Sequence, residues 1–394
     1  MSSIERAILE GVLGRLRCGG LRVRYPDGSW GTFEGPLPGP DAEADLRDWR
    51  LVRRLVATGA IALADGWIDG DFDSPDLPSL IELASLHLEP EHRSRVPEPV
   101  ERVGRMLWRT LGRAASPRGP LRATVEHYDL GNAFFRVWLD ASMTYSSAVF
   151  TREDMTLEGA QHEKYRRLAE VTGLREGMRV LEIGSGWGGF AAYAAGELGC
   201  SVTTVTVSRE QADWVEKLVA ELGLNGLVRV RLEDFAETPG SYDAIVSIEM
   251  IESIPGSRWP AFFGVLRDRL VPGGSVGLQA ITVADRHWRS SDANPDFIRR
   301  YVFPGGQVPS PGVLRREADR VGLAWVADAS FGSSYARTLG EWHRRFDGAW
   351  PRIAELGFDE RFRRMWQYYL SYCEGGFRSG RVDVSQIVLR AGAV

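Results

Sequence analysis

The chain has 394 residues, which is long enough for one large domain and a smaller one. Hydrophobic residues make up 44% and charged residues 26%, as in globular proteins, and a net charge of −5 argues against a protein that coats nucleic acid. No run of about 18 apolar residues predicts a transmembrane helix, and the first residues lack the apolar core of a signal peptide. Three scattered cysteines, Cys18, Cys200 and Cys373, favour a reducing cytoplasm and form no zinc-binding pattern.

The first 90 residues predict a small α+β domain. A helix is expected over residues 4–16, and a hairpin over 21–33 that turns at Pro26-Asp27-Gly28. Three prolines, Pro36, Pro38 and Pro40, predict a loop. Two further stretches, 46–70 and 77–88, read as helices.

Residues 91–122 predict a connector that is rich in proline and arginine. If residues 100–113 form a helix, four arginines share one stripe of it: Arg102, Arg105, Arg109 and Arg113. One interpretation is a basic amphipathic helix that meets anionic lipid headgroups. The alternative is an ordinary surface helix with a solvated arginine face, which is a common arrangement.

Residues 123–394 alternate between strand and helix patterns, which predicts a parallel α/β sheet. The expected strands are residues 178–184, 201–207, 228–234, 242–250 and 275–281. In such a sheet, ligands gather at the carboxyl ends of the strands. The polar and glycine residues that follow these strands are therefore the candidates for a site.

The first of these strands runs directly into a glycine-rich turn and then a helix. The glycines are Gly184, Gly186, Gly188 and Gly189, and Glu182 lies inside the strand. Such a turn lets the backbone approach a ligand, and the helix N-terminus offers free N–H groups. A dinucleotide or a turn without ligand would be compatible with the glycines alone, but the spacing is not G-x-G-x-x-G. An acidic residue inside the strand followed by G-x-G-x-G is typical of methyltransferases that use S-adenosylmethionine (SAM).

Polar residues at the next strand ends strengthen this interpretation. Thr206 ends the second strand where an NAD enzyme would carry an acid, and Gln211 follows it, placed to meet a ribose. Glu233 and Asp234 end the third strand, placed for the adenine or the ribose edge. The fourth strand ends in residues 248–252, at the lip where a substrate would sit.

Several motifs resemble cyclopropane fatty acid synthases and mycolic acid cyclopropane synthases over about residues 120–390. They are HYDLGN (127–132), WLD (138–140), MTYS (143–146), LEIGSGWGGF (181–190), VSIEMIE (246–252), LQAIT (278–282) and FIRRYVFPGG (297–306). Residues 1–90 resemble the N-terminal lipid-associated domain of the bacterial phospholipid enzymes. The resemblance implies a class I SAM-methyltransferase fold, a doubly wound Rossmann-like α/β sheet with a smaller N-terminal α+β domain.

The resemblance also implies which residues hold the cofactor. Tyr145 and Ser146 would contact SAM, and the glycine turn, Thr206 and Gln211 would hold its methionine and ribose parts. Glu233 or Asp234 would meet the adenosine end.

A bicarbonate ion beside the sulfonium methyl is a further implication. The positions that would bind it are Ser147, Glu252, Gln279, the Ile281 backbone and Tyr335. Here Ser147 replaces a cysteine and Gln279 a histidine of the family. Both can still hydrogen-bond an anion, but Gln279 cannot become a cation.

The implied reaction is one-carbon transfer from SAM to the double bond of an unsaturated phospholipid acyl chain, which gives a cyclopropane. The resulting carbocation needs a base, either bicarbonate or Glu252. A 10-methylene product from an oleoyl lipid and a non-catalytic lipid-binding relative remain alternatives. We expect an acyl-sized channel from the glycine turn to Glu252 and Tyr335, a cytoplasmic protein in transient contact with the inner membrane face, and no metal. The sequence is compatible with a homodimer.

Overall fold

The computed structural model describes residues 2–87, 130–288 and 297–392, and the chain forms two compact units. The first unit comprises Met1–Pro117, Asp296–Ile298 and Ile353–Arg381, and the second comprises Arg118–Pro295, Arg299–Arg352 and Val382–Val394. The expected catalytic domain, 123–394, differs from this division because Ile353–Arg381 belongs to the first unit. Most of the connector expected at 91–122, with its four arginines, lies in the first unit's range but outside the described residues.

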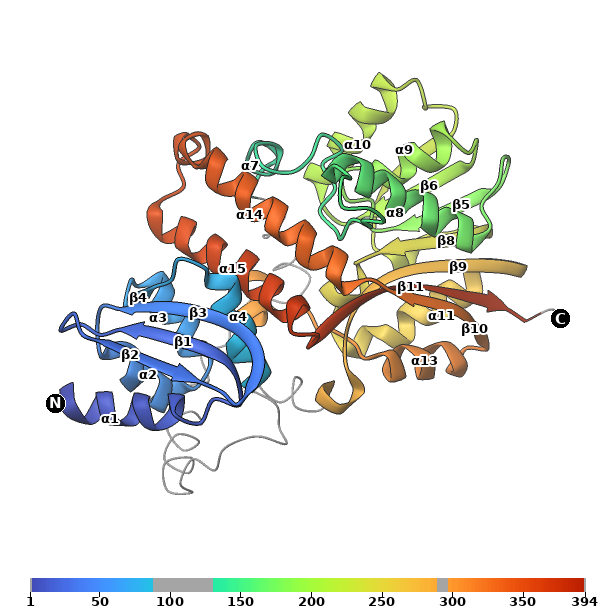
Figure 1. Ribbon diagram of the computed structural model, residues 1–394. Helices are drawn as coiled ribbons and strands as arrows, with labels where there is room; N and C mark the ends of the chain where they lie inside the picture. Colours follow the sequence, from blue (N-terminus) through green and yellow to red (C-terminus); the bar gives the residue numbers. More distant parts are fainter. Residues whose placement is uncertain (1, 88–129, 289–296, 393–394) are drawn as a thin grey trace. The chain divides into compact units, whose positions relative to one another are not determined.

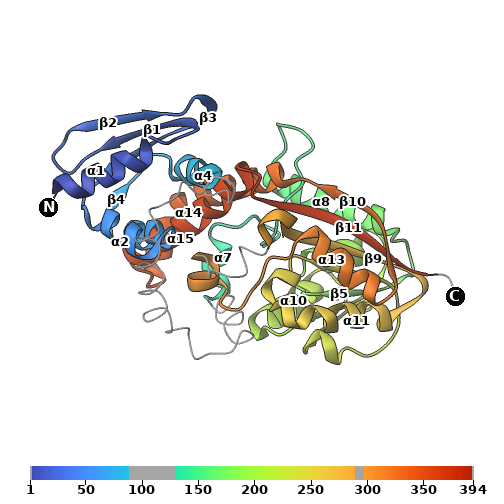
Figure 2. The same ribbon diagram turned by 90° about the horizontal axis from the view of Figure 1, so that it is seen from below.

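The first unit contains a four-stranded sheet in the order β2-β1-β3-β4. Its elements are α1 (Ser2–Leu13), β1 (Cys18–Arg24), β2 (Trp30–Glu34), β3 (Leu37–Leu46), α2 (Arg50–Thr58), α3 (Ile61–Ile68), β4 (Phe72–Asp73), α4 (Leu77–His87) and α15 (Glu360–Arg378). Figure 2 shows α1 beside the strands of this sheet. The predicted hairpin is confirmed, because β1 and β2 pair antiparallel around a turn in which Gly28 has a φ of 85°.

The loop predicted at the three prolines is confirmed for Pro36 but wrong for Pro38 and Pro40, because β3 begins at Leu37 and pairs parallel with β1. The pairing is irregular there: Cys18 pairs with Leu37, and the register shifts before Gly20 pairs with Asp41. Proline has no N–H to donate to a ladder and is tolerated at irregular strand ends. The prolines therefore disturb the start of the strand without preventing it.

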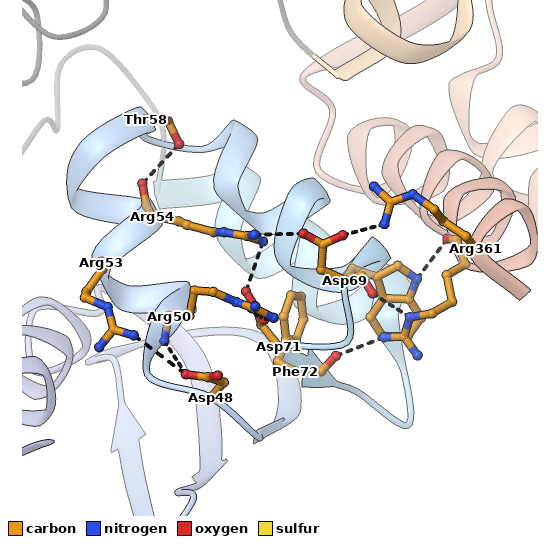
Figure 3. A network of polar contacts seen from close by, with 11 residues as sticks. Asp48, Arg50, Arg53, Arg54, Thr58, Asp69, Asp71, Phe72 and Arg361 are labelled. Carbon is orange, nitrogen blue, oxygen red and sulfur yellow. Dashed lines mark hydrogen bonds and ion pairs between the residues drawn. The ribbon is translucent and has the colours of Figure 1, made fainter. Parts of the chain in front are cut away.

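Helix α15 joins the first unit through contacts with residues far away in the sequence. The Trp67 indole N–H donates to the Arg364 carbonyl at 2.9 Å, and the Arg364 guanidinium lies 4.4 Å from the centre of the Trp67 ring. Arg361 of the same helix donates to Asp69 at 2.5 Å (Figure 3). These contacts explain why this helix belongs with the N-terminal elements.

A network of ion pairs ties α2 to the turn after α3 (Figure 3). Asp71 is fully buried and accepts hydrogen bonds from Arg50 and, at 3.1 Å, from Arg54. Arg54 also pairs with Asp69 at 2.8 Å. A buried carboxylate needs such partners, because an unpaired charge away from water is costly.

The second unit is built on a seven-stranded sheet in the order β10-β11-β9-β8-β5-β6-β7. The strands are β5 (Arg179–Ile183), β6 (Ser201–Thr206), β7 (Val228–Leu232), β8 (Tyr242–Ile248), β9 (Leu270–Val283), β10 (Leu323–Ser330) and β11 (Val382–Ala391). The five strands β5 to β9 pair in parallel, whereas β11 pairs antiparallel with both β9 and β10. All five strands predicted from the sequence are present.

Helices cover both faces of this sheet. They are α8 (Leu157–Thr172), α9 (Gly189–Gly196), α10 (Arg209–Glu221), α11 (Trp259–Arg269) and α13 (Pro311–Arg320). Helix α7 (Asn132–Arg136) also belongs to this unit, and α14 (Gly332–Glu355) lies mostly in it. Successive residues of β5 point to opposite faces: Leu181 and Ile183 pack in the core with α11 and α13, and Val180 packs in the core with α8, α9 and α10. Figure 1 shows α8 and α9 on one side of the strands and α11 and α13 on the other. The predicted doubly wound α/β fold is confirmed.

Candidate active site

The glycine turn after β5 forms one wall of a pocket in the second unit. Gly184, Gly186 and Gly188 all have positive φ, at 92°, 50° and 86°, a conformation that residues with a side chain rarely adopt. A Cβ on Gly184 would also lie 3.1 Å from the Met250 side chain. The turn therefore has no side chains at these positions, and a ligand in the pocket can approach its backbone.

The pocket contains about 1120 Å³ of space not filled by protein atoms, including open solvent at its mouth. Seven of the nine predicted cofactor residues line it: Tyr145, Ser146, Gly184, Gly186, Thr206, Gln211 and Glu233. Gly188 does not, because it is the N-cap residue before α9 and lies so close to α10 that a Cβ there would meet Val215. Asp234 does not either, because its carboxylate pairs with Arg258 at 2.8 Å and caps the following turn.

Two loops present polar groups to the pocket in fixed orientations. The Thr206 hydroxyl donates to the Gln211 side chain at 2.8 Å, and Ser208 caps α10 by accepting from the Gln211 N–H. Glu233 is held by the Arg231 guanidinium at 2.7 Å and 2.8 Å. These side chains could meet the hydroxyl groups of a ribose.

Carboxylates inside the pocket suit a cationic ligand. Glu182 lines the pocket, is 2% exposed and accepts a hydrogen bond from Thr204 at 2.6 Å. Burial raises the pKa of Glu182 to about 8, against the opposing effects of that hydrogen bond and of Lys164. A bound sulfonium or ammonium group would favour its ionised form.

Helix α8 positions the segment 143–146. Lys164 donates to the Ser146 hydroxyl at 2.6 Å, Gln161 donates to the Ser146 carbonyl at 3.0 Å, and the hydroxyls of Thr144 and Tyr165 lie 2.7 Å apart. Lys164 is fully buried, and burial lowers its pKa to about 7 although nearby carboxylates oppose the shift. Sequence reasoning assigned no role to Lys164, because nothing in the helix pattern indicates that this lysine points inward at the site.

An aromatic cluster surrounds Tyr145. Its ring centre lies 5.4 Å from that of Phe135, 5.7 Å from Trp138 and 5.2 Å from Trp342, and Tyr335 lies 6.2 Å from Trp342. Such ring faces attract cations when water is excluded. Only Tyr145 and Tyr335 of this set were predicted as site residues.

Three of the residues predicted around the reacting carbon converge on Glu249, to which no role was assigned. Its carboxylate accepts from the Ser147 backbone N–H at 2.9 Å, the Gln279 side-chain amide at 2.7 Å and the Tyr335 hydroxyl at 2.7 Å. Glu249 also lines the pocket. Burial raises the pKa of Glu249, while these hydrogen bonds and the charge of Lys164 oppose the rise.

Glu252 lies beside this cluster and accepts a hydrogen bond from the Ile281 backbone N–H. Its other oxygen, Oε2, is buried and has no hydrogen-bond partner among the described residues. Burial, together with the charge of Glu249, raises the pKa of Glu252 to about 8. The five residues predicted to bind bicarbonate thus do come together, but their donors are engaged by two carboxylates of the chain.

The expected channel differs from the pocket that the structure has. The lining runs from the glycine turn to Glu249, Ser253 and Ile254, but it does not include Glu252 or Tyr335. Glu249 lines the end of the pocket and accepts a hydrogen bond from the Tyr335 hydroxyl. In the part of the chain that the structure describes, no cluster of His, Cys, Asp or Glu is arranged to hold a metal ion, and no helix is long and apolar enough to cross a membrane.

Comparison with known proteins decides the family. The family model described as "Mycolic acid cyclopropane synthetase" matches residues 116–387. This chain belongs to that family. A tuberculostearic acid methyltransferase of Mycobacterium tuberculosis, UfaA1, is 35% identical over 391 residues, covering 94% of this chain and 87% of its own. The cyclopropane-fatty-acyl-phospholipid synthase of Escherichia coli is 32% identical over 382 residues, covering 94% of this chain and 96% of its own.

Solved structures of cyclopropane synthases match about 70% of this chain. The M. tuberculosis cyclopropane synthase MmaA2 aligns with a TM-score of 0.65 and 32% identity, over 70% of this chain and 99% of its own. The mycolic acid cyclopropane synthase CmaA1, in complex with S-adenosylhomocysteine (SAH), aligns with a TM-score of 0.65 and 31% identity, over 69% of this chain and 99% of its own. The chain is therefore a SAM-dependent methyltransferase of class I fold, and the pocket at the glycine turn suits its methyl donor.

Proposed function

We propose that this enzyme transfers one carbon from SAM to the C=C bond of an unsaturated phospholipid acyl chain and forms a cyclopropane. One observation carries the proposal: the pocket that suits the methyl donor ends at an ordered carboxylate, Glu249. A simple methyl transfer to oxygen or nitrogen requires no such group at the transferred carbon. Transfer to an alkene does, because the cation that forms must lose a proton.

The chemistry assigns distinct tasks to the residues. The alkene π electrons form the new C–C bond to the SAM methyl carbon, the C–S bond breaks, and its electron pair stays on sulfur in SAH. The faces of Tyr145 and Trp342 would stabilise the resulting carbocation, by about 2 kcal/mol each when desolvated. Loss of a proton from the transferred carbon then lets that C–H pair close the ring. The buried cluster also excludes water, which would otherwise capture the cation.

The choice of a phospholipid as substrate is supported by how much of this chain each relative matches. The E. coli phospholipid synthase matches 94% of this chain, including the first unit, whereas MmaA2 matches 67% of this chain and 94% of its own. An enzyme that takes acyl chains from phospholipids works at a membrane surface. We therefore propose transient contact with the inner face of the membrane, to which Arg102, Arg105 and Arg109 would contribute.

A second product has support of its own. UfaA1, which is 35% identical, is named a tuberculostearic acid methyltransferase, so its name indicates a methyl-branched acyl product. The same carbocation leads there if a hydride shifts before the proton leaves, which gives a methylene group that a reductase can convert to a methyl branch. The two products diverge after the same transfer step.

The test uses the purified enzyme with trideuteromethyl-labelled SAM and three separate substrates: vesicles of dioleoyl phosphatidylglycerol, free oleic acid and oleoyl carrier protein. We expect label in the phospholipid, with one deuterium lost. Ozonolysis separates the products, since it cleaves a methylene group to a ketone and leaves a cyclopropane intact. SAM binding without label in any of the three lipids would contradict the proposal and favour a non-catalytic lipid-binding protein.

A further inference from the structure

The carboxylate of Glu249 occupies the donors that the family resemblance assigns to bicarbonate. The Ser147 N–H, the Gln279 amide and the Tyr335 hydroxyl donate to Glu249, and the Ile281 N–H donates to Glu252. An anion in this place would compete with the carboxyl groups of Glu249 and Glu252 for every one of these donors and would be repelled by the charge of ionised Glu249. A separate bicarbonate ion does not fit the residues present.

Two of these donor residues, Gln279 and Ser147, are held in orientation by further hydrogen bonds. The Gln279 amide oxygen accepts from Gln386 at 3.1 Å, so its NH₂ group must point toward Glu249. Gln386 is oriented in turn, because it also donates to the Lys164 carbonyl at 3.1 Å. The Ser147 hydroxyl turns away and donates to the Ala148 carbonyl, so Ser147 contributes its backbone N–H and not the side chain that replaces cysteine. The site is thus built around one carboxylate.

The backbone at Glu249 supports a dedicated role for its side chain. Its φ is 50°, in the left-handed region that glycine adopts readily and that other residues adopt at a cost in stability. The backbone is held there by a hydrogen bond from the Glu249 N–H to the Gln279 carbonyl at 2.8 Å. Strained residues of this kind concentrate at functional sites. A glycine would satisfy the backbone better but would supply no carboxylate.

Building on the proposed function, we infer that Glu249 is the catalytic base of this enzyme and replaces bicarbonate with a carboxylate of the chain itself. In this step a Glu249 oxygen takes a proton from the carbon that SAM has delivered, and the C–H electron pair closes the ring onto the cationic carbon. The products are the cyclopropane, SAH and a protonated Glu249, which returns its proton to solvent before the next turnover.

The second carboxylate suits this assignment. Glu249 accepts three hydrogen bonds that favour its ionised form, whereas Glu252 accepts one and has an oxygen without a partner in the described residues. Two neighbouring carboxyl groups do not ionise equally, and the one that accepts more hydrogen bonds ionises first. Glu249 is therefore the proton acceptor, and Glu252 is the protonated neighbour.

The experiment compares the wild type with Glu249→Gly and Glu249→Gln in buffer freed of carbon dioxide, with and without added sodium bicarbonate. Glu249→Gly relieves the backbone and opens a space lined by three donors, whereas Glu249→Gln fills that space with an amide that cannot accept the proton. Glu216→Gln, an exposed glutamate on α10, is the matched control. Thermal melting and SAM titration establish that each variant is folded and binds the methyl donor.

We expect the wild type and Glu216→Gln to turn over equally with and without bicarbonate. Both Glu249 variants should lose about 10²–10⁴-fold in rate, as is usual when a general base is removed, and bicarbonate should rescue Glu249→Gly but not Glu249→Gln. A wild type that needs bicarbonate, or a Glu249→Gln variant at the wild-type rate, would overturn the inference while leaving the proposed function intact. Failure of the proposed function differs, since the wild type would then label no lipid under either condition.

Discussion

Replacing Tyr335 with phenylalanine isolates the contribution of a single hydrogen bond to the proposed base. The Tyr335 hydroxyl donates to Glu249 Oε2 at 2.7 Å, and the tyrosine is only 8% exposed, so water does not easily take its place. A hydrogen bond to a charged group is worth about 1.5–3 kcal/mol. Since about 1.4 kcal/mol corresponds to one pKa unit, the loss should raise the pKa of Glu249 by about one to two units.

The assay is the pH dependence of kcat/KM for labelling of oleoyl phospholipid. The proposed base works in its ionised form, so the rate falls as pH decreases through the pKa of Glu249. In Tyr335→Phe this acid limb should move upward by about one to two pH units, while the rate at high pH recovers most of the wild-type value. Tyr242→Phe is the control, because its hydroxyl bonds the Pro239 carbonyl at 2.9 Å, away from the site. An unmoved acid limb in Tyr335→Phe would refute the assignment of Glu249 as the base.

Three further changes test the structure around the site. Gly184→Ala places a Cβ 3.1 Å from Met250 in a backbone with a φ of 92°, so denaturant titration should show a loss of about 1–2 kcal/mol in the free energy of unfolding. The pKa of Lys164 is about 7 in the folded chain and 10.5 ordinarily, so the unfolded chain binds more protons between these values. The free energy of unfolding should therefore rise with pH over that window. In Lys164→Met the melting temperature should increase less between pH 8 and 10 than in the wild type, because the contribution of Lys164 is gone. Asp71→Asn breaks the ion pairs of the buried Asp71 carboxylate with Arg50 and Arg54. Because both arginines are partly exposed, thermal melting should show a loss of only about 1–3 kcal/mol in the free energy of unfolding, and SAM affinity should be unchanged.

The parts of the fold that were predictable are those whose signal is local. The five strands around the cofactor turn are short apolar runs that end in glycine or polar residues, and each is present within a few residues of its expected position. No local pattern indicated that α15 belongs to the first unit, because the hydrogen bond that ties it there joins Trp67 and Arg364, which are 297 residues apart. The start of β3 was also hidden, because three prolines favour a loop unless a neighbouring strand tolerates their missing N–H groups.

The same distinction applies to the site. Thr206, Gln211 and Glu233 were predicted to lie together because the carboxyl ends of parallel strands meet at one edge of a sheet, and they do line one pocket. Glu249 sits in the segment recognised as the lip of the site, yet its role depends on donors from three other segments, at Ser147, Gln279 and Tyr335. Two of these positions depart from the family pattern. Those departures gave the only available sign that the anion site had changed, and they did not indicate what had replaced the anion.

A base that belongs to the chain has a consequence for the product that a diffusible ion would not have. Three donors and a strained backbone hold the Glu249 carboxylate in one place, so the hydrogen that leaves must be the one that the cation presents to it. Closure to a cyclopropane and loss after a hydride shift both take the proton from the transferred carbon, and closure requires that the base act before the hydride moves. On this assignment, we expect the placement of the Glu249 carboxylate by these hydrogen bonds to influence the balance between the two products. Weakening the bond from Gln279, which is itself aligned by Gln386, should change the ratio of cyclopropane to methylene more than it changes the rate at which SAM is consumed.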